Sequence, residues 1–127
     1  PYNNQMLQMK DDAFRQMALM MANNMTANQS KIDTLAGWMV AADRTTYVYG
    51  YTDLMKLDLR DDLLRVKAHT LILGATFPSK EVAKSTFEKQ YQNLKNKQIE
   101  MAPESKHFIM FDQPEWFYQQ VNAFLKK

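Results

Sequence analysis

The feature that most constrains this chain is a change of hydrophobic period after Lys67. Residues 70–73 (TLIL) form an unbroken run of strand length that Gly74 closes. Such a run, rich in β-branched and aliphatic residues, is typical of a strand buried on both faces of a parallel sheet. We therefore expect a strand here, in a chain whose earlier residues follow a helical period.

A second strand follows this one. Apolar residues recur at helical spacing from Val82 as far as Asn96, and residues 97–102 then alternate between polar and apolar until Pro103 stops them. A last helix is expected from about Pro114, after Asp112 or Gln113 as its cap. Because parallel strands need a crossover helix, the order strand, helix, strand, helix predicts a parallel pair within an α/β fold.

The residues before this α/β part are expected to be helical. Ser30 with Asp33 is similar to a capping box, and Asp43 can cap the helix that follows. The patterns predict three helices and one short amphipathic turn or helix, over residues 11–24, 30–42, 43–55 and 58–65.

Composition excludes several classes of function. The 127 residues suit one small core, and a net charge of +2 is too low for sequence-independent nucleic-acid binding. Zero cysteines exclude disulfides, thiolate zinc sites and cysteine nucleophiles, and they fit a cytoplasmic protein. The longest apolar stretch, residues 35–42, is far shorter than the roughly 20 residues of a membrane helix, so no membrane partner is expected.

One segment carries a recognisable motif. Residues 105–117 read S-K-H-F-I-M-F-D-Q-P-E-W-F, with His107 in the loop after the second expected strand. Open α/β sheets bind their ligands at the C-terminal ends of the strands, where this loop lies. The segment resembles the histidine segment of the α/β-hydrolase superfamily, in which the catalytic His is followed by an acidic residue, Pro and an aromatic residue. Here Asp112, Pro114 and Trp116 occupy those places.

A second segment carries the same resemblance. Residues 58–74 (DLRDDLLRVKAHTLILG) look like the passage from the superfamily's cap domain into its penultimate strand. The resemblance covers essentially the whole chain. It implies a helical cap over residues 1–57 and the C-terminal part of the catalytic domain, strand-helix-strand-helix, over residues 58–127.

The resemblance implies that His107 is a general base. A neutral imidazole near pH 7 can take a proton from a nucleophile and return it to the leaving group. Without the resemblance, the simpler interpretation is a loop histidine that only hydrogen-bonds nearby backbone.

The chain also departs from the superfamily's pattern. It contains three glycines, at positions 37, 50 and 74, which cannot form the nucleophile elbow G-x-S-x-G. Residues 75–79, where the superfamily often has its acid, contain no carboxylate. Glu81 is the nearest candidate acid, although it also suits the first turn of a helix, where negative charge is favourable. Alternatively, the acid lies upstream, after an earlier strand.

The remaining polar features have structural explanations. We interpret His69 as a strand-edge residue, and Asp58, Asp61 and Asp62 as a solvated face rather than a metal site. No cofactor or metal is expected. The ten methionines suit core packing, or, in a cap, an adaptable apolar substrate pocket.

Three hypotheses follow. The first is that the chain is the C-terminal portion of an α/β hydrolase that acts on a small hydrophobic ester-like substrate. The nucleophile would lie on an N-terminal half of the same fold or on a second chain. We therefore expect this chain alone to be inactive. The chain would then be a processed or truncated one. The second hypothesis is a non-catalytic interaction module with the same scaffold. The third is an independent binding domain that forms a homo-oligomer through its incomplete sheet.

Overall fold

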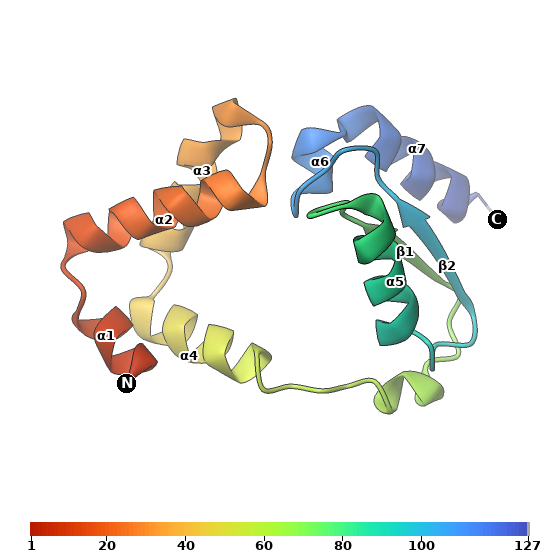
Figure 1. The fold of residues 1–127 in the computed structure, drawn as a ribbon, viewed down its shortest axis with the longest axis horizontal. Helices are drawn as coiled ribbons and strands as arrows, with labels where there is room; N and C mark the ends of the chain where they lie inside the picture. The colour runs from red at the N-terminus through yellow and green to blue at the C-terminus, as the bar shows by residue number, and fades with distance from the viewer. Residues whose placement is uncertain (127) are drawn as a thin grey trace. The chain divides into compact units, whose positions relative to one another are not determined.

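The computed structural model describes residues 1–126 and has a mixed α/β fold that is mostly helical (Figure 1). The elements are α1 (Tyr2–Gln8), α2 (Asp11–Met25), the 3-10 helix η1 (Gln29–Lys31), α3 (Ile32–Ala41), α4 (Arg44–Leu54), the 3-10 helix η2 (Asp62–Arg65), β1 (Thr70–Gly74), α5 (Lys80–Gln90), β2 (Lys97–Met101), α6 (Ile109–Asp112) and α7 (Pro114–Leu125). They form two compact units, Pro1–Leu57 and Asp58–Lys127. That the first is a cap and the second part of a hydrolase stays a prediction.

The first unit is helical and has an apolar core. Met6 of α1, Phe14 of α2 and Val48 of α4 are buried against one another. The Phe14 ring meets the Tyr47 ring edge-on, with centroids 6.0 Å apart. Helix α2 packs against α3, and α1 packs against α4. The helical period of the sequence therefore becomes one buried stripe on each helix.

Arg44 joins three helices of this unit. Its guanidinium lies 4.3 Å from the centre of the Phe14 ring and donates hydrogen bonds to the Met9 carbonyl, at the end of α1, and to the Asp11 carboxylate, at the start of α2. The Arg44 side chain is 26% exposed, so its stem covers part of the core while its charge is satisfied. A residue at the start of α4 thus fixes the connection between α1 and α2.

The helix caps agree with the sequence in one case and differ in another. Asp43 accepts a hydrogen bond from the Thr46 backbone N–H at 2.8 Å, which confirms it as the cap of α4. This bond also lowers the pKa of the Asp43 carboxyl. The capping box at Ser30 and Asp33 was wrong: Asn28 instead accepts from the Ser30 N–H, at 3.1 Å, because a short 3-10 turn precedes α3.

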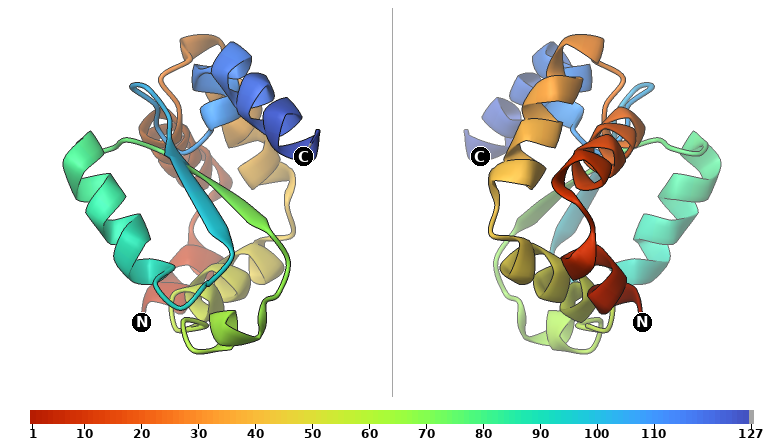
Figure 2. Two further views of the ribbon diagram at one scale, coloured as in Figure 1. Left: turned by 90° about the vertical axis from the view of Figure 1, so that its right-hand side faces the viewer. Right: turned by 90° about the vertical axis from the view of Figure 1, so that its left-hand side faces the viewer.

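The second unit is built on two parallel strands. β1 and β2 pair in register from Thr70 with Lys97 to Gly74 with Met101, which confirms both predicted strands and their direction. Figure 2 shows α5 on one side of the strand pair and α7 on the other. At the end of β1, a Cβ atom added to Gly74 would lie 2.7 Å from the Met101 sulfur, so a larger residue here would require the Met101 side chain to move.

Three details of the second unit differ from expectation. The residues of β1 before Gly74 are half-buried rather than fully buried, because the sheet has two strands among the described residues. Helix α5 ends at Gln90 instead of Asn96, and Leu94 is buried from the turn that follows. The short helix α6 was not predicted, and neither was α1 in the first unit.

No helix among residues 1–126 is both long enough and apolar enough to cross a bilayer.

Candidate functional site

The candidate site lies where the two strands end. The loop after β1 (residues 75–79) and the loop between β2 and α6 (residues 102–108) leave the strand pair at the same end (Figure 1). Parallel strands bring their carboxyl ends to one edge of the sheet, which is the usual ligand-binding edge of an open α/β fold. The fold therefore places the His107 segment at the predicted edge.

His107 is exposed on the second of these loops. Its ring meets the Phe108 ring edge-on with centroids 5.2 Å apart, and its carbonyl accepts a hydrogen bond from the Ile109 N–H at 3.1 Å. The imidazole itself has no hydrogen bond or ion pair within residues 1–126. An accessible imidazole of this kind can exchange protons with a bound molecule.

Glu81, the candidate acid, lies in the first turn of α5. Its side chain is exposed, and in the described part of the chain it makes no hydrogen bond or ion pair with His107. The structure therefore does not join the two predicted site residues. The helix around Glu81 is capped by Ser79, whose hydroxyl accepts from the Val82 N–H at 3.3 Å. A carboxylate at this position is favourable for the helix whether or not it has a catalytic role.

Three residues that we did not predict as site residues hold the His107 loop. The Thr76 hydroxyl accepts a hydrogen bond from the Ser105 N–H at 2.9 Å, and the Ser105 carbonyl accepts from the Thr76 N–H at 2.9 Å. The Asp112 carboxylate accepts from the Lys106 N–H at 2.8 Å. It acts on this loop rather than as the cap of α7, which begins after Gln113 without a side-chain cap.

One signal in the sequence could have indicated this role for Asp112. A carboxylate six residues after Lys106, and two before Pro114, is close enough in sequence to reach back to the Lys106 backbone N–H. Thr76 and Ser105 gave no such signal, because they are 29 residues apart and meet only through strand pairing. Contacts of this length depend on tertiary structure.

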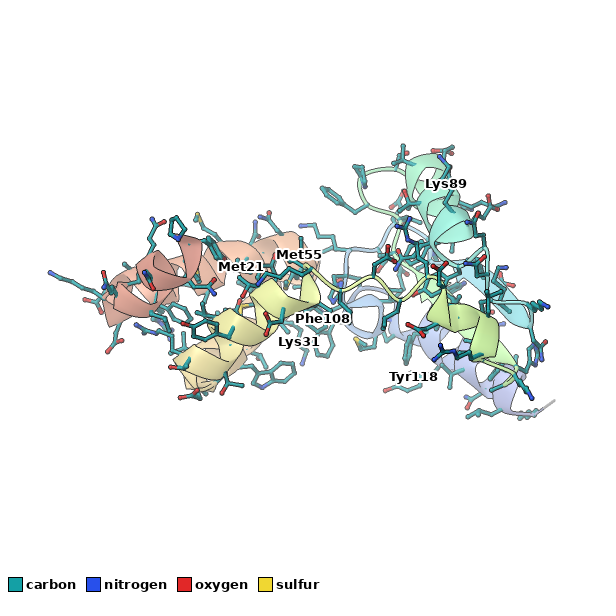
Figure 3. All side chains as sticks on the ribbon, turned by 90° about the horizontal axis from the view of Figure 1, so that it is seen from below. Met21, Lys31, Met55, Lys89, Phe108 and Tyr118 are labelled. Carbon is teal, nitrogen blue, oxygen red and sulfur yellow. The ribbon has the colours of Figure 1, made fainter. Side chains whose placement is uncertain are left out.

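Aromatic side chains occur on this loop and on other elements of the second unit. Phe108 stacks on Phe111 with centroids 5.6 Å apart, and Phe77, on the loop after β1, is largely exposed. Tyr118 extends outward from α7 (Figure 3). Phe108 thus gives the His107 ring one apolar neighbour on its own loop, which suits an apolar group on a bound molecule.

Two of the acidic residues near the start of the second unit, Asp58 and Asp62, form ion pairs. The Asp58 carboxylate accepts two hydrogen bonds from the Arg60 guanidinium, and these bonds lower the pKa of Asp58 to about 2. Asp62 pairs with Arg65 at 3.2 Å. Within residues 1–126, no three metal-ligating side chains come together.

His69, the second histidine of the chain, lies just before β1 and is exposed. Its ring lies 5.0 Å from the Phe124 ring of α7, centroid to centroid. It therefore packs at the start of the strand, at the opposite end from His107.

Comparisons with protein-family models, with curated proteins and with solved structures found no match for this chain.

Proposed function

We propose that this chain is the C-terminal portion of an α/β-hydrolase-type enzyme, and that His107 is its general base. The observation that carries the proposal is the position of His107: an exposed imidazole at the carboxyl end of two parallel strands, in a loop with hydrogen bonds on both sides of it. The sequence 105–117, with Asp112, Pro114 and Trp116, resembles the histidine segment of that superfamily.

The proposed reaction is hydrolysis through an acyl intermediate. His107 takes the proton from a nucleophile's hydroxyl as its oxygen attacks the substrate carbonyl, and then gives this proton to the leaving alcohol. Water hydrolyses the acyl intermediate with the same base. Because the chain contains no G-x-S-x-G motif, the nucleophile lies on an N-terminal half of the same fold or on a second chain.

The substrate class follows from the apolar surroundings. Phe108 lies beside the candidate base and stacks on Phe111, and the helical unit contains most of the ten methionines. These side chains favour a small hydrophobic ester-like substrate. We also propose a cytoplasmic location, with which the absence of cysteine agrees.

The test has two steps. Peptide mass spectrometry on the source preparation first determines whether a polypeptide with G-x-S-x-G precedes Pro1 or accompanies the chain. The assembled protein is then assayed on p-nitrophenyl esters of short acyl chains.

His107→Ala should lower kcat by about 10²- to 10⁴-fold, the usual contribution of a general base. His69→Ala is the matched control, because it removes the other exposed histidine. A His107→Ala variant with wild-type turnover would overturn the proposal.

A non-catalytic interaction module is the second candidate. Two observations favour it: residues 75–79 contain no carboxylate, and neither Glu81 nor another described carboxylate contacts the His107 imidazole. In this case no companion segment with G-x-S-x-G is found, and the protein hydrolyses no ester.

A further inference from the structure

The pairing of the two strands continues into their loops. One residue beyond β2, the Ala102 N–H donates to the Gly74 carbonyl at 2.9 Å. Three residues later, the Ser105 carbonyl accepts from the Thr76 N–H and the Thr76 hydroxyl accepts from the Ser105 N–H, both at 2.9 Å. The Thr76 hydroxyl also donates to the Ser105 carbonyl at 3.4 Å. The loop after β1 and the loop of His107 are therefore joined beyond the last residues of the sheet.

Ser105 is the buried anchor of this contact. It is 4% exposed, and its hydroxyl donates to the Lys106 carbonyl at 2.9 Å. A buried backbone N–H without a partner is costly, so the Thr76 hydroxyl satisfies a group that water does not reach freely. Ser105, two positions before His107, is thus fixed to the loop that follows β1.

A second contact fixes the next residue from the other side. The Asp112 carboxylate accepts from the Lys106 N–H at 2.8 Å, and a hydrogen bond to a charged acceptor is stronger than a neutral one. Helix α6 supports this carboxylate, because the Asp112 N–H donates to the Phe108 carbonyl at 3.1 Å. The backbone therefore has a defined hydrogen bond at each residue from 105 to 108, whereas the His107 imidazole has none within the described residues.

We propose that Thr76 and Asp112 are positioning residues for His107: together they set where the imidazole lies at the strand ends. Its place depends on the loop backbone, because no described side chain hydrogen-bonds the ring. A catalytic base must lie within about half an ångström of its productive position, so a loop held at two successive residues suits this task. The catalytic meaning of this positioning rests on the function proposed above; the positioning itself does not.

The experiment uses NMR on the full 127-residue chain and needs no substrate. It records amide hydrogen exchange at Lys106 and the ring signals of His107. We expect Asp112→Ala to speed exchange at Lys106 by roughly tenfold to a hundredfold, the loss of one hydrogen bond to a charged group. The His107 ring signals should shift and broaden, while exchange stays unchanged at Thr70 and Tyr91, whose amides donate to the Asn96 and Phe87 carbonyls outside both loops.

Conservative variants separate positioning from simple stability. Asp112→Asn keeps a carbonyl acceptor and should restore most of the wild-type His107 signals. Thr76→Ser keeps the hydroxyl and should do the same, whereas Thr76→Val leaves the Ser105 N–H without its partner and should shift them. The controls are Asp62→Ala and Thr86→Val, the same chemical changes at exposed positions of the same unit.

Two results would overturn the proposal. One is an Asp112→Ala variant whose Lys106 exchange and His107 signals match the wild type. The other is faster exchange at Thr70 and Tyr91 by the same factor as at Lys106, which would mean that Asp112 only stabilises the unit. Both are independent of catalysis: a protein that hydrolyses no ester can still show the positioning, and an active enzyme can lack it.

Discussion

The helical unit buries Phe14, Leu35 and Val48 almost completely, whereas Leu71 and Ile72 of β1 remain half-exposed. The difference comes from how each kind of element pairs its backbone N–H and C=O groups. A helix makes its hydrogen bonds internally and needs only one covered stripe, but a strand needs a neighbour on each edge. In the second unit, polar contacts between loops, such as that of Thr76, continue where strand pairing ends. We therefore expect apolar truncations to act most strongly on the first unit.

The largest effect is expected at Phe14. Phe14→Ala should lower the free energy of unfolding of the helical unit by about 3 to 5 kcal/mol, because it removes a fully buried ring and leaves a cavity. The measurement is denaturant unfolding followed by far-UV circular dichroism. Phe77→Ala is the control, since the Phe77 side chain is 68% exposed and its loss should cost little. Equal effects of the two variants would contradict the assignment of Phe14 to the core of the helical unit.

The second prediction asks how much one charged side chain, that of Arg44, contributes to the stability of the helical unit. Arg44→Ala should cost about 1 to 2 kcal/mol, because it removes a bond to the Met9 carbonyl and the guanidinium over the Phe14 ring. The Asp11 contact adds little, since that carboxylate is 95% exposed. Arg15→Ala, at an exposed position of α2, is the matched control and should change the unfolding midpoint only slightly. A loss of stability no greater than that of Arg15→Ala would show that packing alone holds the three helices.

The sequence predicted those parts of the molecule that depend on local patterns. The run of residues 70–73, the cap at Asp43 and the proline that begins α7 are all determined within a few residues, and the structure confirms each. The order of the elements was enough to predict a parallel pair.

The rest depends on contacts between distant residues. The hydrogen bonds of Thr76 with Ser105, 29 residues apart, exist only because β1 and β2 pair. The bond from Lys106 to Asp112 is local, but it forms through helix α6, which was not predicted. Helix α5 ends early, and the Asn93 side chain in the turn after it donates to the Arg60 carbonyl at 2.9 Å. The exposure of β1 could not be predicted either, because a residue pattern does not tell how many strands flank it.

A smaller effect is expected in the turn before Ser105. Glu104 has φ of 42°, in the left-handed region that favours glycine, directly after Pro103. Glu104→Gly should raise the stability of the second unit by about 0.5 to 1 kcal/mol, because it relieves this conformation. The same change at Glu88, in the helical backbone of α5, should lower stability by about 1 kcal/mol. Thermal unfolding measures both, and the same sign at the two positions would refute the explanation from backbone conformation.

The smallest effect concerns Asp58, at the first residue of the second unit. Hydrogen bonds from Arg60 lower its pKa from 3.8 to about 2 in the folded chain. Since the folded pKa lies below the unfolded one, the pair stabilises the fold above the unfolded pKa, and this contribution is lost as the pH falls from about 4 to about 2. Both side chains are well exposed, so salt should weaken the pair and the change in stability should be slight. Carboxyl NMR titration should place the Asp58 midpoint near 2, and Arg60→Ala should return it toward 3.8. A midpoint that does not move in Arg60→Ala would mean that the surrounding backbone, and not the guanidinium, lowers the pKa.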